Sequence, residues 1–269
     1  PFGKVVDIGG HASDVALDER RGVVYVANYT GDEIAVISTA NGLVQRTINV
    51  MSQPAALALS PDARYLVVAH YRSALSAGGL TVVDLDANQQ RRLASGFPPL
   101  AVAFGADNRA LVMTTQDLRL LDPANGTTTV ISTYASLAPK TLPLEFAKFP
   151  AEIIRASLGA SPEGNIISGV ADAEGSGDAQ SVLVYVRYDV TLRQLKLLGY
   201  TAAPALGPRV ASVGSNGALQ LFGWALLNER GVLMAQFPNA LGKLNVGSHA
   251  IDLSRGLVYA QVPEAVQTA

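Results

Sequence analysis

The chain has 269 residues, of which 49% are hydrophobic and 16% charged, with no cysteine and a net charge of −2. This charge gives no basic surface for a nucleic acid, and the missing cysteines exclude disulfides and thiolate metal sites. No apolar run reaches the roughly 18 residues that a transmembrane helix requires. We therefore expect a single domain over residues 1–269, with a large core and strands covered on both faces.

A strand-turn-strand pattern begins between Arg21 and Val50, in the stretch "RGVVYVANYTGDEIAVISTANGLVQRTINV". Apolar residues alternate there with others, and short polar turns separate the predicted strands "VVYVAN", "EIAVIST" and "VQRTINV". A further apolar segment, "DVALD", comes just before them. Together the four segments predict one antiparallel sheet.

The pattern recurs along the whole chain. The turns that we take as equivalent fall at Asp18, Ser60, Gly105, Ser161, Ser215 and Ser254, with spacings of 42, 45, 56, 54 and 39 residues. A repeat of roughly 40–50 residues with several strands is typical of a β-propeller, in which four-stranded blades cover one another's faces. Gly42 and Gly126 supply the positive φ that tight hairpins need. The alternative is a solenoid or a sandwich.

The repeat resembles a known family. "YVAN" (Tyr25–Asn28), "GDEIAVIST", "NGLVQRTINV" and "QPAALALSPDARYLVVAH" are similar to the YVTN β-propeller repeat, with Ala27 in place of its threonine. The resemblance is close over residues 11–70, weak in the fourth and fifth repeats, and returns in "RGLVYAQV". It implies a bacterial or archaeal protein that is extracellular, periplasmic or on the cell surface. The motif is structural, so it implies a fold and no active site.

The two ends of the chain suggest how a ring would close. Residues 3–8 resemble an outermost strand, and residues 249–253 and 256–262 resemble the first two strands of a last blade. We expect six blades, the last one completed by residues 3–8. The alternative is an open fragment, or part of a seven-bladed or larger chain, because the sequence stops in mid-blade. The start at Pro1 without a methionine indicates either a processed chain or a piece of a longer one.

Three connections are longer than the repeat needs, and we expect them on one face: His70–Gly79, Tyr134–Ile153 and Asp172–Gln180. Long loops on a rigid scaffold often carry function. The candidate ligand-binding residues on this face are Tyr71, Arg72, Phe146, Phe149 and Asp172. Since Arg72 and Phe149 lie outside the predicted strands, we expect their replacement by alanine to weaken binding with little effect on folding.

Metal ions and cofactors are not predicted. Asp172, Glu174 and Asp178 lie in a glycine-rich segment that could hold calcium, but their spacing differs from the EF-hand pattern, and a solvated loop is the preferred interpretation. The three histidines, His11, His70 and His249, fall on different repeats, so they do not form a converging ligand set.

The function expected from these features is that of a non-enzymatic scaffold that binds a protein, peptide or glycan. The first alternative is a lactonase-like or other hydrolytic propeller enzyme, which would need several charged residues at matching positions. Only Arg72, Asp172 and Asp178 qualify, which favours binding. The second alternative is a structural module of a larger cell-surface protein.

Overall fold

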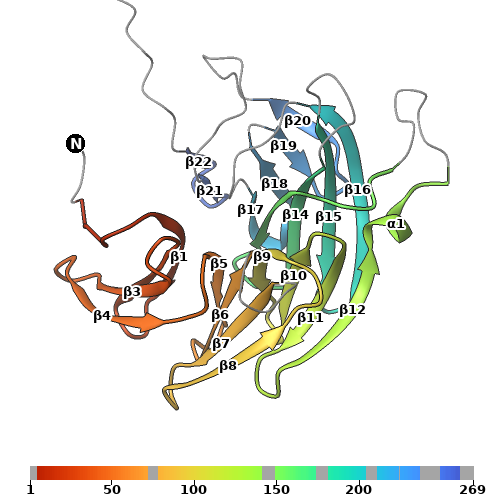
Figure 1. The fold of residues 1–269 in the computed structure, drawn as a ribbon. Coiled ribbons are helices and arrows are strands. Elements are labelled where there is room, and N and C mark those ends of the chain that lie inside the picture. Colours follow the sequence, from red (N-terminus) through yellow and green to blue (C-terminus); the bar gives the residue numbers. More distant parts are fainter. Residues whose placement is uncertain are drawn as a thin grey trace, which may run out of the picture. The chain divides into compact units, whose positions relative to one another are not determined.

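The computed structural model describes residues 5–71, 78–140, 149–173, 181–203, 211–223, 225–236 and 249–260. The chain divides into two compact units, Pro1–Ile131 and Ser132–Ala269, and each is described by itself. The described residues form five four-stranded antiparallel sheets and one two-stranded pair, with a single short α-helix (Figure 1). The predicted all-β class, with repeated four-stranded sheets, is confirmed.

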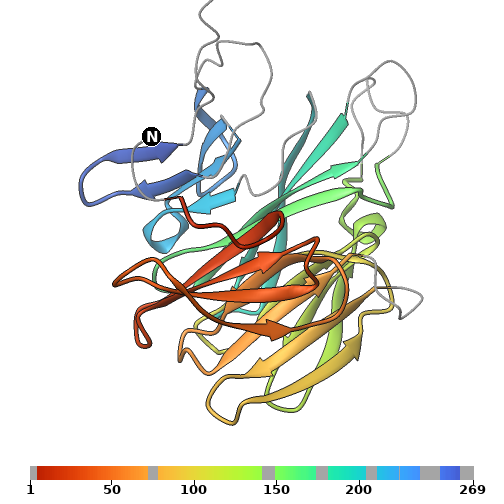
Figure 2. The ribbon, with the colours of Figure 1, turned by 60° about the vertical axis from the view of Figure 1, so that its left-hand side comes forward.

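The first unit contains three sheets, in which the strands lie side by side in chain order (Figure 2). The first sheet consists of β1 (Ala12–Asp18), β2 (Val23–Asn28), β3 (Glu33–Ser38) and β4 (Val44–Asn49). The second consists of β5 (Pro54–Leu59), β6 (Tyr65–His70), β7 (Gly79–Asp84) and β8 (Gln89–Ala94). The third consists of β9 (Pro99–Phe104), β10 (Ala110–Thr114), β11 (Asp117–Asp122) and β12 (Thr127–Thr133).

The second unit opens with the helix α1 (Tyr134–Leu137) and continues with two sheets and a pair. The fourth sheet consists of β13 (Arg155–Ala160), β14 (Ile166–Ala173), β15 (Ser181–Asp189) and β16 (Gln194–Ala203). The fifth consists of β17 (Ala211–Val213), β18 (Leu219–Phe222), β19 (Ala225–Asn228) and β20 (Leu233–Gln236), with a 3-10 turn η1 (Ser215–Gly217) after β17. The terminal pair is β21 (His249–Asp252) and β22 (Leu257–Ala260).

The second sheet shows why its strands are almost continuously apolar. Successive side chains of a strand point to opposite faces. In β6, Leu66 and Val68 pack in a cluster with the first sheet, while Tyr65 and Val67 pack in a cluster with the third sheet. Both faces of this sheet are therefore buried, as predicted from the composition.

A repeated turn links the first two strands of every sheet and of the terminal pair. A residue with positive φ donates its N–H to the carbonyl three residues earlier. The donors are Gly22, Ala63, Asn108, Gly164, Gly217 and Gly256, and the acceptors are Glu19, Ser60, Gly105, Ser161, Gly214 and Leu253. Three of these turns begin at the predicted residues, Ser60, Gly105 and Ser161. In the others the turn begins at Glu19, Gly214 and Leu253, one residue away from the predicted position.

Two further predictions concern local structure. Gly42 and Gly126 have the expected positive φ, 65° and 79°. Residues 5–8, by contrast, are not in a strand, and Val5 is 82% exposed; residues 3 and 4 lie outside the described residues. The predicted strand over residues 3–8 is therefore not formed in its described part.

Candidate functional site

Each sheet has two ends that differ in their connections. The turn end holds the links from first to second and from third to fourth strand, and each of these has four or five residues. The crossover end holds the links from second to third strand and from one sheet to the next. Its long connections are residues 71–78, 138–154, 174–180, 204–210 and 237–248. The three predicted long connections all belong to the crossover ends. The connections over residues 204–210 and 237–248 were not predicted.

The first cross-strand pair at the crossover end, which we call the entry pair, joins the start of the first strand to the end of the second. The entry pairs are Ala12–Asn28, Pro54–His70, Pro99–Thr114, Arg155–Asp172 and Ala211–Phe222. In the three sheets of the first unit a register shift, or β-bulge, follows this pair. A bulge re-aims the neighbouring side chain. In the fourth sheet the register is regular from Arg155–Asp172 onward.

Asn28 is a structural anchor in the first sheet. Its side-chain Nδ2 donates to the carbonyl of Ile8 at 2.9 Å, and its Oδ1 accepts from the N–H of Gly31 at 3.0 Å. A Cβ on Gly31 would lie only 2.4 Å from Nδ2, so glycine is needed for this approach. The asparagine of the "YVAN" motif thus joins the incoming chain to the next turn.

His70 has the same place in the second sheet and is fully buried. Its Nδ1 lies 3.1 Å from the carbonyl of Ser52, and its Nε2 lies 3.0 Å from Oγ1 of Thr81. Because a carbonyl only accepts, Nδ1 carries the proton and Nε2 accepts from the threonine hydroxyl. Burial lowers the pKa of His70 to about 4, so the ring is neutral near pH 7. His70 is a neutral anchor of the crossover.

Asp172 has this place in the fourth sheet, and its environment differs. Its Oδ2 lies 3.5 Å from Nε of Arg155, and its backbone carbonyl accepts from Ile154 at 2.8 Å. The carboxylate side chain is 3% exposed, whereas the Arg155 side chain is 47% exposed. The acidic group is therefore buried behind a cation that reaches solvent.

Two aromatic rings lie at the same end of the fourth sheet. Phe149 meets Tyr200 of β16 edge to face, with ring centroids 5.5 Å apart. Tyr200 pairs through Val184 with Ala171, which places it one row from Asp172. Phe149 is only 8% exposed, so it belongs to the core. This corrects our expectation that replacing Phe149 would leave folding unaffected, since an apolar ring outside the strands still fills the interior.

The predicted site residues are distributed over both units. Tyr71 follows β6 in the first unit and is half-buried, while Phe149 and Asp172 lie at the crossover end of the fourth sheet in the second. Arg72, Phe146, Glu174 and Asp178 lie outside the described residues. Among the residues that the structure does describe, no group of three or more His, Asp or Glu side chains could hold a metal.

Sequence reasoning missed Arg155 and Tyr200. A signal for Arg155 existed, because Arg155 and Asp172 lie at nearly equal distances from the middle of the turn that begins at Ser161. Opposite charges placed symmetrically about a hairpin turn face each other across the two strands. Tyr200 gave no such signal, since its contact with Phe149 depends on the path of the intervening chain.

A serine–histidine contact in the second unit resembles a nucleophile with its base. Ser212 Oγ lies 2.7 Å from Nδ1 of His249 and 2.5 Å from its backbone carbonyl. Ser13 makes the same bond to the carbonyl of Pro54 in the first unit. A hydroxyl has one proton, and the carbonyl can only accept it, so Nδ1 must donate to Oγ. A protonated Nδ1 cannot activate this serine, and the contact joins neighbouring strands.

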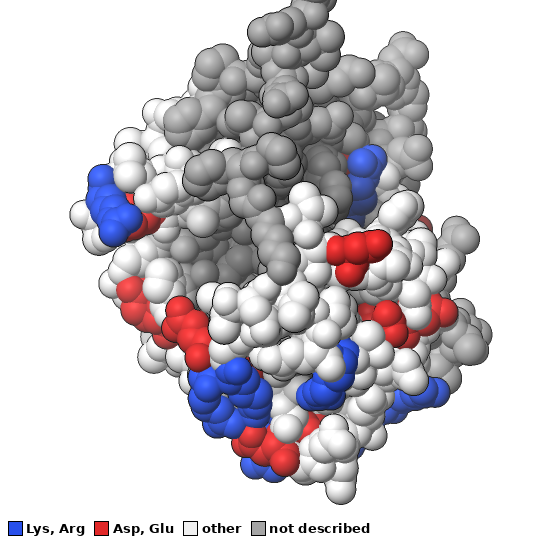
Figure 3. Space-filling view, turned by 90° about the vertical axis from the view of Figure 1, so that its left-hand side faces the viewer, with Lys and Arg blue, Asp and Glu red and all other residues white. Residues whose placement is uncertain are grey.

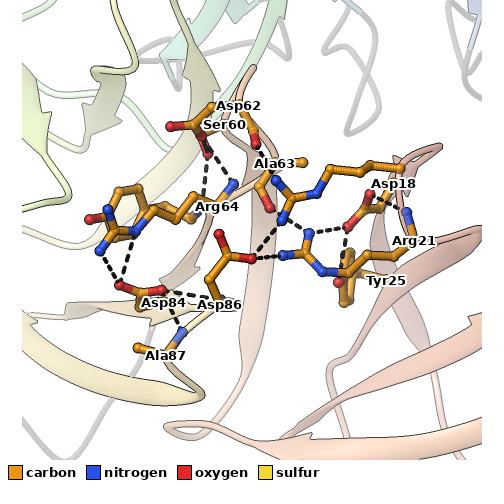
Figure 4. Close-up of polar contacts among 12 residues, drawn as sticks. Asp18, Arg21, Tyr25, Ser60, Asp62, Ala63, Arg64, Asp84, Asp86 and Ala87 are labelled. Atoms are coloured by element: carbon orange, nitrogen blue, oxygen red, sulfur yellow. Dashed lines mark hydrogen bonds and ion pairs between the residues drawn. The ribbon is translucent and has the colours of Figure 1, made fainter.

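The turn end of the first unit carries a charged network (Figure 4). Nη1 of Arg21 donates to Oδ2 of Asp18 at 2.7 Å and to the carbonyl of Ala63 at 2.5 Å, and Tyr25 donates to Asp18 at 3.2 Å. Asp86 of the second sheet also binds Arg21. Burial would raise the pKa of Asp18, but the hydrogen bonds from Arg21 lower it overall. Arg20 pairs with Asp86 as well, so two arginines balance the two aspartates of this network, which joins the first two sheets.

The surface charge shows the same balance. On the face in Figure 3, basic and acidic side chains of the described residues alternate and no large area has a single sign. None of the helices in the described part of the chain has the length and apolar character needed to cross a membrane. A broad electrostatic surface for a polyanion is therefore not seen on this face.

Comparison with known proteins gives the fold. No family model and no curated protein matches the sequence. Solved structures do match: hydrazine synthase of Kuenenia stuttgartiensis has 15% identity and a TM-score of 0.57, covering 85% of this chain and 58% of that one. The extracellular domain of BT4673 from B. thetaiotaomicron has 14% identity and a TM-score of 0.63, with 96% and 33% covered.

An auxiliary nutrient binding protein from Bacteroides thetaiotaomicron has 11% identity and a TM-score of 0.60, with 94% of this chain and 66% of that chain covered. The chain thus spans between a third and two thirds of the length of these three proteins. At these identities the likeness concerns the fold alone. The chain has the repeated four-stranded sheets of β-propeller proteins.

Proposed function

We propose that the protein is a non-enzymatic binding scaffold whose ligand site lies at the crossover end of its sheets. The observation that carries the proposal is the contrast in connection length between the two ends of the sheets. Every turn-end connection has four or five residues, whereas five crossover-end connections have seven or more. Binding residues are commonly placed on variable loops held by a rigid scaffold.

The finer fold assignment belongs to the same proposal. We infer a six-bladed propeller of the YVTN type, in which residues 3–8 become the outer strand of the blade that begins with β21 and β22 when the ring closes, although residues 5–8 form no strand in the described structure. The support is that Leu257, Val258 and Tyr259 of β22 are 47%, 36% and 50% exposed, while the second strands of the other sheets are largely buried. Within the described residues β22 pairs with β21 alone, and a strand edge with exposed apolar residues favours pairing with a further strand.

Deletion of residues 1–6 tests the closure. This deletion keeps Ile8, whose carbonyl binds Asn28. If residues 3–8 complete a blade, the shortened protein should melt at a lower temperature and associate, as size-exclusion chromatography would show. A monomer with an unchanged melting temperature would favour the open or seven-bladed alternative.

An exported location fits the comparisons. One structural neighbour is an extracellular domain and another is described as a nutrient binding protein. We therefore propose that this protein acts outside the cytoplasm and binds a peptide, protein or glycan there. A hydrolytic activity has less support, because the one serine–histidine contact described above has the wrong proton arrangement for a nucleophile and base.

A binding screen tests the function directly. Glycan and peptide arrays would be probed with the wild type, with the crossover-end variants Tyr71→Ala and Arg155→Gln, and with the turn-end variant Arg255→Gln. We expect at least one ligand whose binding is weakened by a crossover-end change and unaffected by the turn-end change. Binding lost only with Arg255→Gln, or no binding to any ligand, would contradict the proposal.

A further inference from the structure

Two polar side chains are fully buried between the fourth and fifth sheets of the second unit. Ser168 lies on β14 and Gln220 on β18, and each residue is 0% exposed. Among the residues that the structure describes, neither Oγ of Ser168 nor Oε1 of Gln220 has a hydrogen-bond partner. A buried polar atom without a partner costs free energy, so a folded protein keeps one only where something compensates it.

The strand registers place both side chains on the faces through which the two sheets meet. Side chains two residues apart on a strand point to the same face. Ser168 precedes Val170 by two residues on β14. Gln220 precedes Phe222 by two residues on β18, and both apolar residues belong to one buried cluster. The two polar residues therefore have corresponding places in one interface, each on the turn-end side of its apolar neighbour.

The other hydrogen bonds fix which atoms still need a partner. Nε2 of Gln220 donates to the carbonyl of Asn228 at 3.1 Å. Because a carbonyl only accepts, the amide cannot be turned around, and Oε1 is the atom that requires a donor. Arg187, the cross-strand partner of Ser168, uses its Nη1 on the carbonyl of Gly217 at 2.8 Å. The protein thus offers an acceptor and a hydroxyl in the same interface, and they do not bond to each other.

We propose that a buried water molecule binds between the fourth and fifth sheets and bridges these two residues. The water donates to Oε1 of Gln220 and accepts from the hydroxyl of Ser168, which satisfies both atoms. Internal waters commonly occupy such sites, where polar groups cannot reach each other. A metal ion fits less well, because two neutral oxygens are too few ligands and Arg187 adds positive charge beside Ser168. This site does not depend on the ligand site proposed at the crossover end.

A crystal structure of the wild-type protein tests the inference, and an ordered water within hydrogen-bonding distance of both Oγ of Ser168 and Oε1 of Gln220 is expected. In solution, magnetic relaxation dispersion of the water signal reports the long-lived internal waters. This signal should fall by about one water molecule per protein when Ser168→Ala and Gln220→Met are combined. Ser161→Ala is the matched control and should leave the signal unchanged, because this buried serine of the same sheet already bonds to Asn165.

Unfolding measurements add a readout of the bridge itself. If one water links the two residues, either single variant already weakens its binding, and the second change then costs less. The combined variant should therefore lose less stability than the sum of the losses in Ser168→Ala and Gln220→Met.

The inference is wrong if Ser168 and Gln220 bond to each other directly in the crystal, or if no water lies between them. An unchanged relaxation signal in the combined variant, with its fold confirmed by circular dichroism, would contradict it equally. So would stability losses that simply add. If the combined variant does not fold, the crystal structure of the wild type decides alone.

Discussion

Asn28 and His70 in the first unit and Asp172 in the second have the same place in the repeat, yet they meet different partners. The first two are neutral and bind the backbone of the crossover, and a β-bulge follows each entry pair. Asp172 is charged, has a regular register and faces the side chain of Arg155. The comparison teaches that the crossover is held through a side chain in the first two sheets and through the backbone bond from Ile154 to Asp172 in the fourth.

The largest effect is expected at Phe149, which we compare with Tyr71, the other described aromatic residue of the predicted binding set. Phe149→Ala should lower the free energy of unfolding by about 3 kcal/mol, because a buried ring and its contact with Tyr200 are lost. Urea denaturation would measure this. Tyr71→Ala, at a half-buried residue after β6, should cost about 1 kcal/mol or less. An equal loss of unfolding free energy in the two variants would show that Phe149 contributes no more to the core than Tyr71 does.

The second prediction concerns the neutral anchor in the first unit. Burial holds the pKa of His70 at about 4 in the folded state, against 6.5 for an ordinary histidine. Between these values the unfolded state binds more protons, so stability should be complete above pH 6.5 and fall as pH decreases to 4. The loss should reach about 3 kcal/mol.

His70→Asn is the matched control, since asparagine occupies this place in the first sheet. Unfolding measured across this pH range should lose most of its pH dependence in the variant. A wild type with flat stability between pH 6.5 and 4 would mean that His70 is not held neutral by burial.

The third prediction uses the turn end as a reference. Asp18→Asn should cost about 2 kcal/mol, because Arg21 and Tyr25 lose a buried charged acceptor. Asp86→Asn, at a far more exposed carboxylate, should cost no more than about 1 kcal/mol. Chemical denaturation of both variants decides this, and a larger loss for Asp86→Asn would contradict the burial argument.

The fourth and smallest effect concerns the repeated turn. Ala63 has a φ of 56°, where Gly22 and Gly256 have glycine. Ala63→Gly should raise stability by about 0.5 kcal/mol, because relief of left-handed strain exceeds the added chain entropy. Gly256→Ala should lower stability by about 1 kcal/mol through strain alone, since no atom lies within 4 Å of the new Cβ. Thermal melts of both variants would show opposite shifts.

Local sequence signals predicted much of the fold. The turn glycines Gly42 and Gly126, and the apolar strand around Leu66, follow from φ preferences and from burial on both faces. The β-bulges of the first three sheets were not predicted, because register depends on how each hairpin meets its neighbours. The pairing of Arg155 with Asp172 was missed, although their symmetry about the turn at Ser161 was a usable signal. Phe149 was predicted to be an exposed binding residue but is buried, since no periodic pattern marks a loop residue whose side chain packs in the core.

The double variant Arg155→Ala with Asp172→Asn gives the most direct test of the central comparison, because it installs in the fourth sheet the kind of entry pair that Ala12 and Asn28 form in the first. If the backbone bond from Ile154 to Asp172 attaches the crossover and the charged pair is not needed for this, the free energy of unfolding should stay within about 1 kcal/mol of the wild type, or rise, as when a buried ion pair is replaced by neutral groups. A loss of about 3 kcal/mol or more would show that the pair holds the sheet together, and would contradict the account.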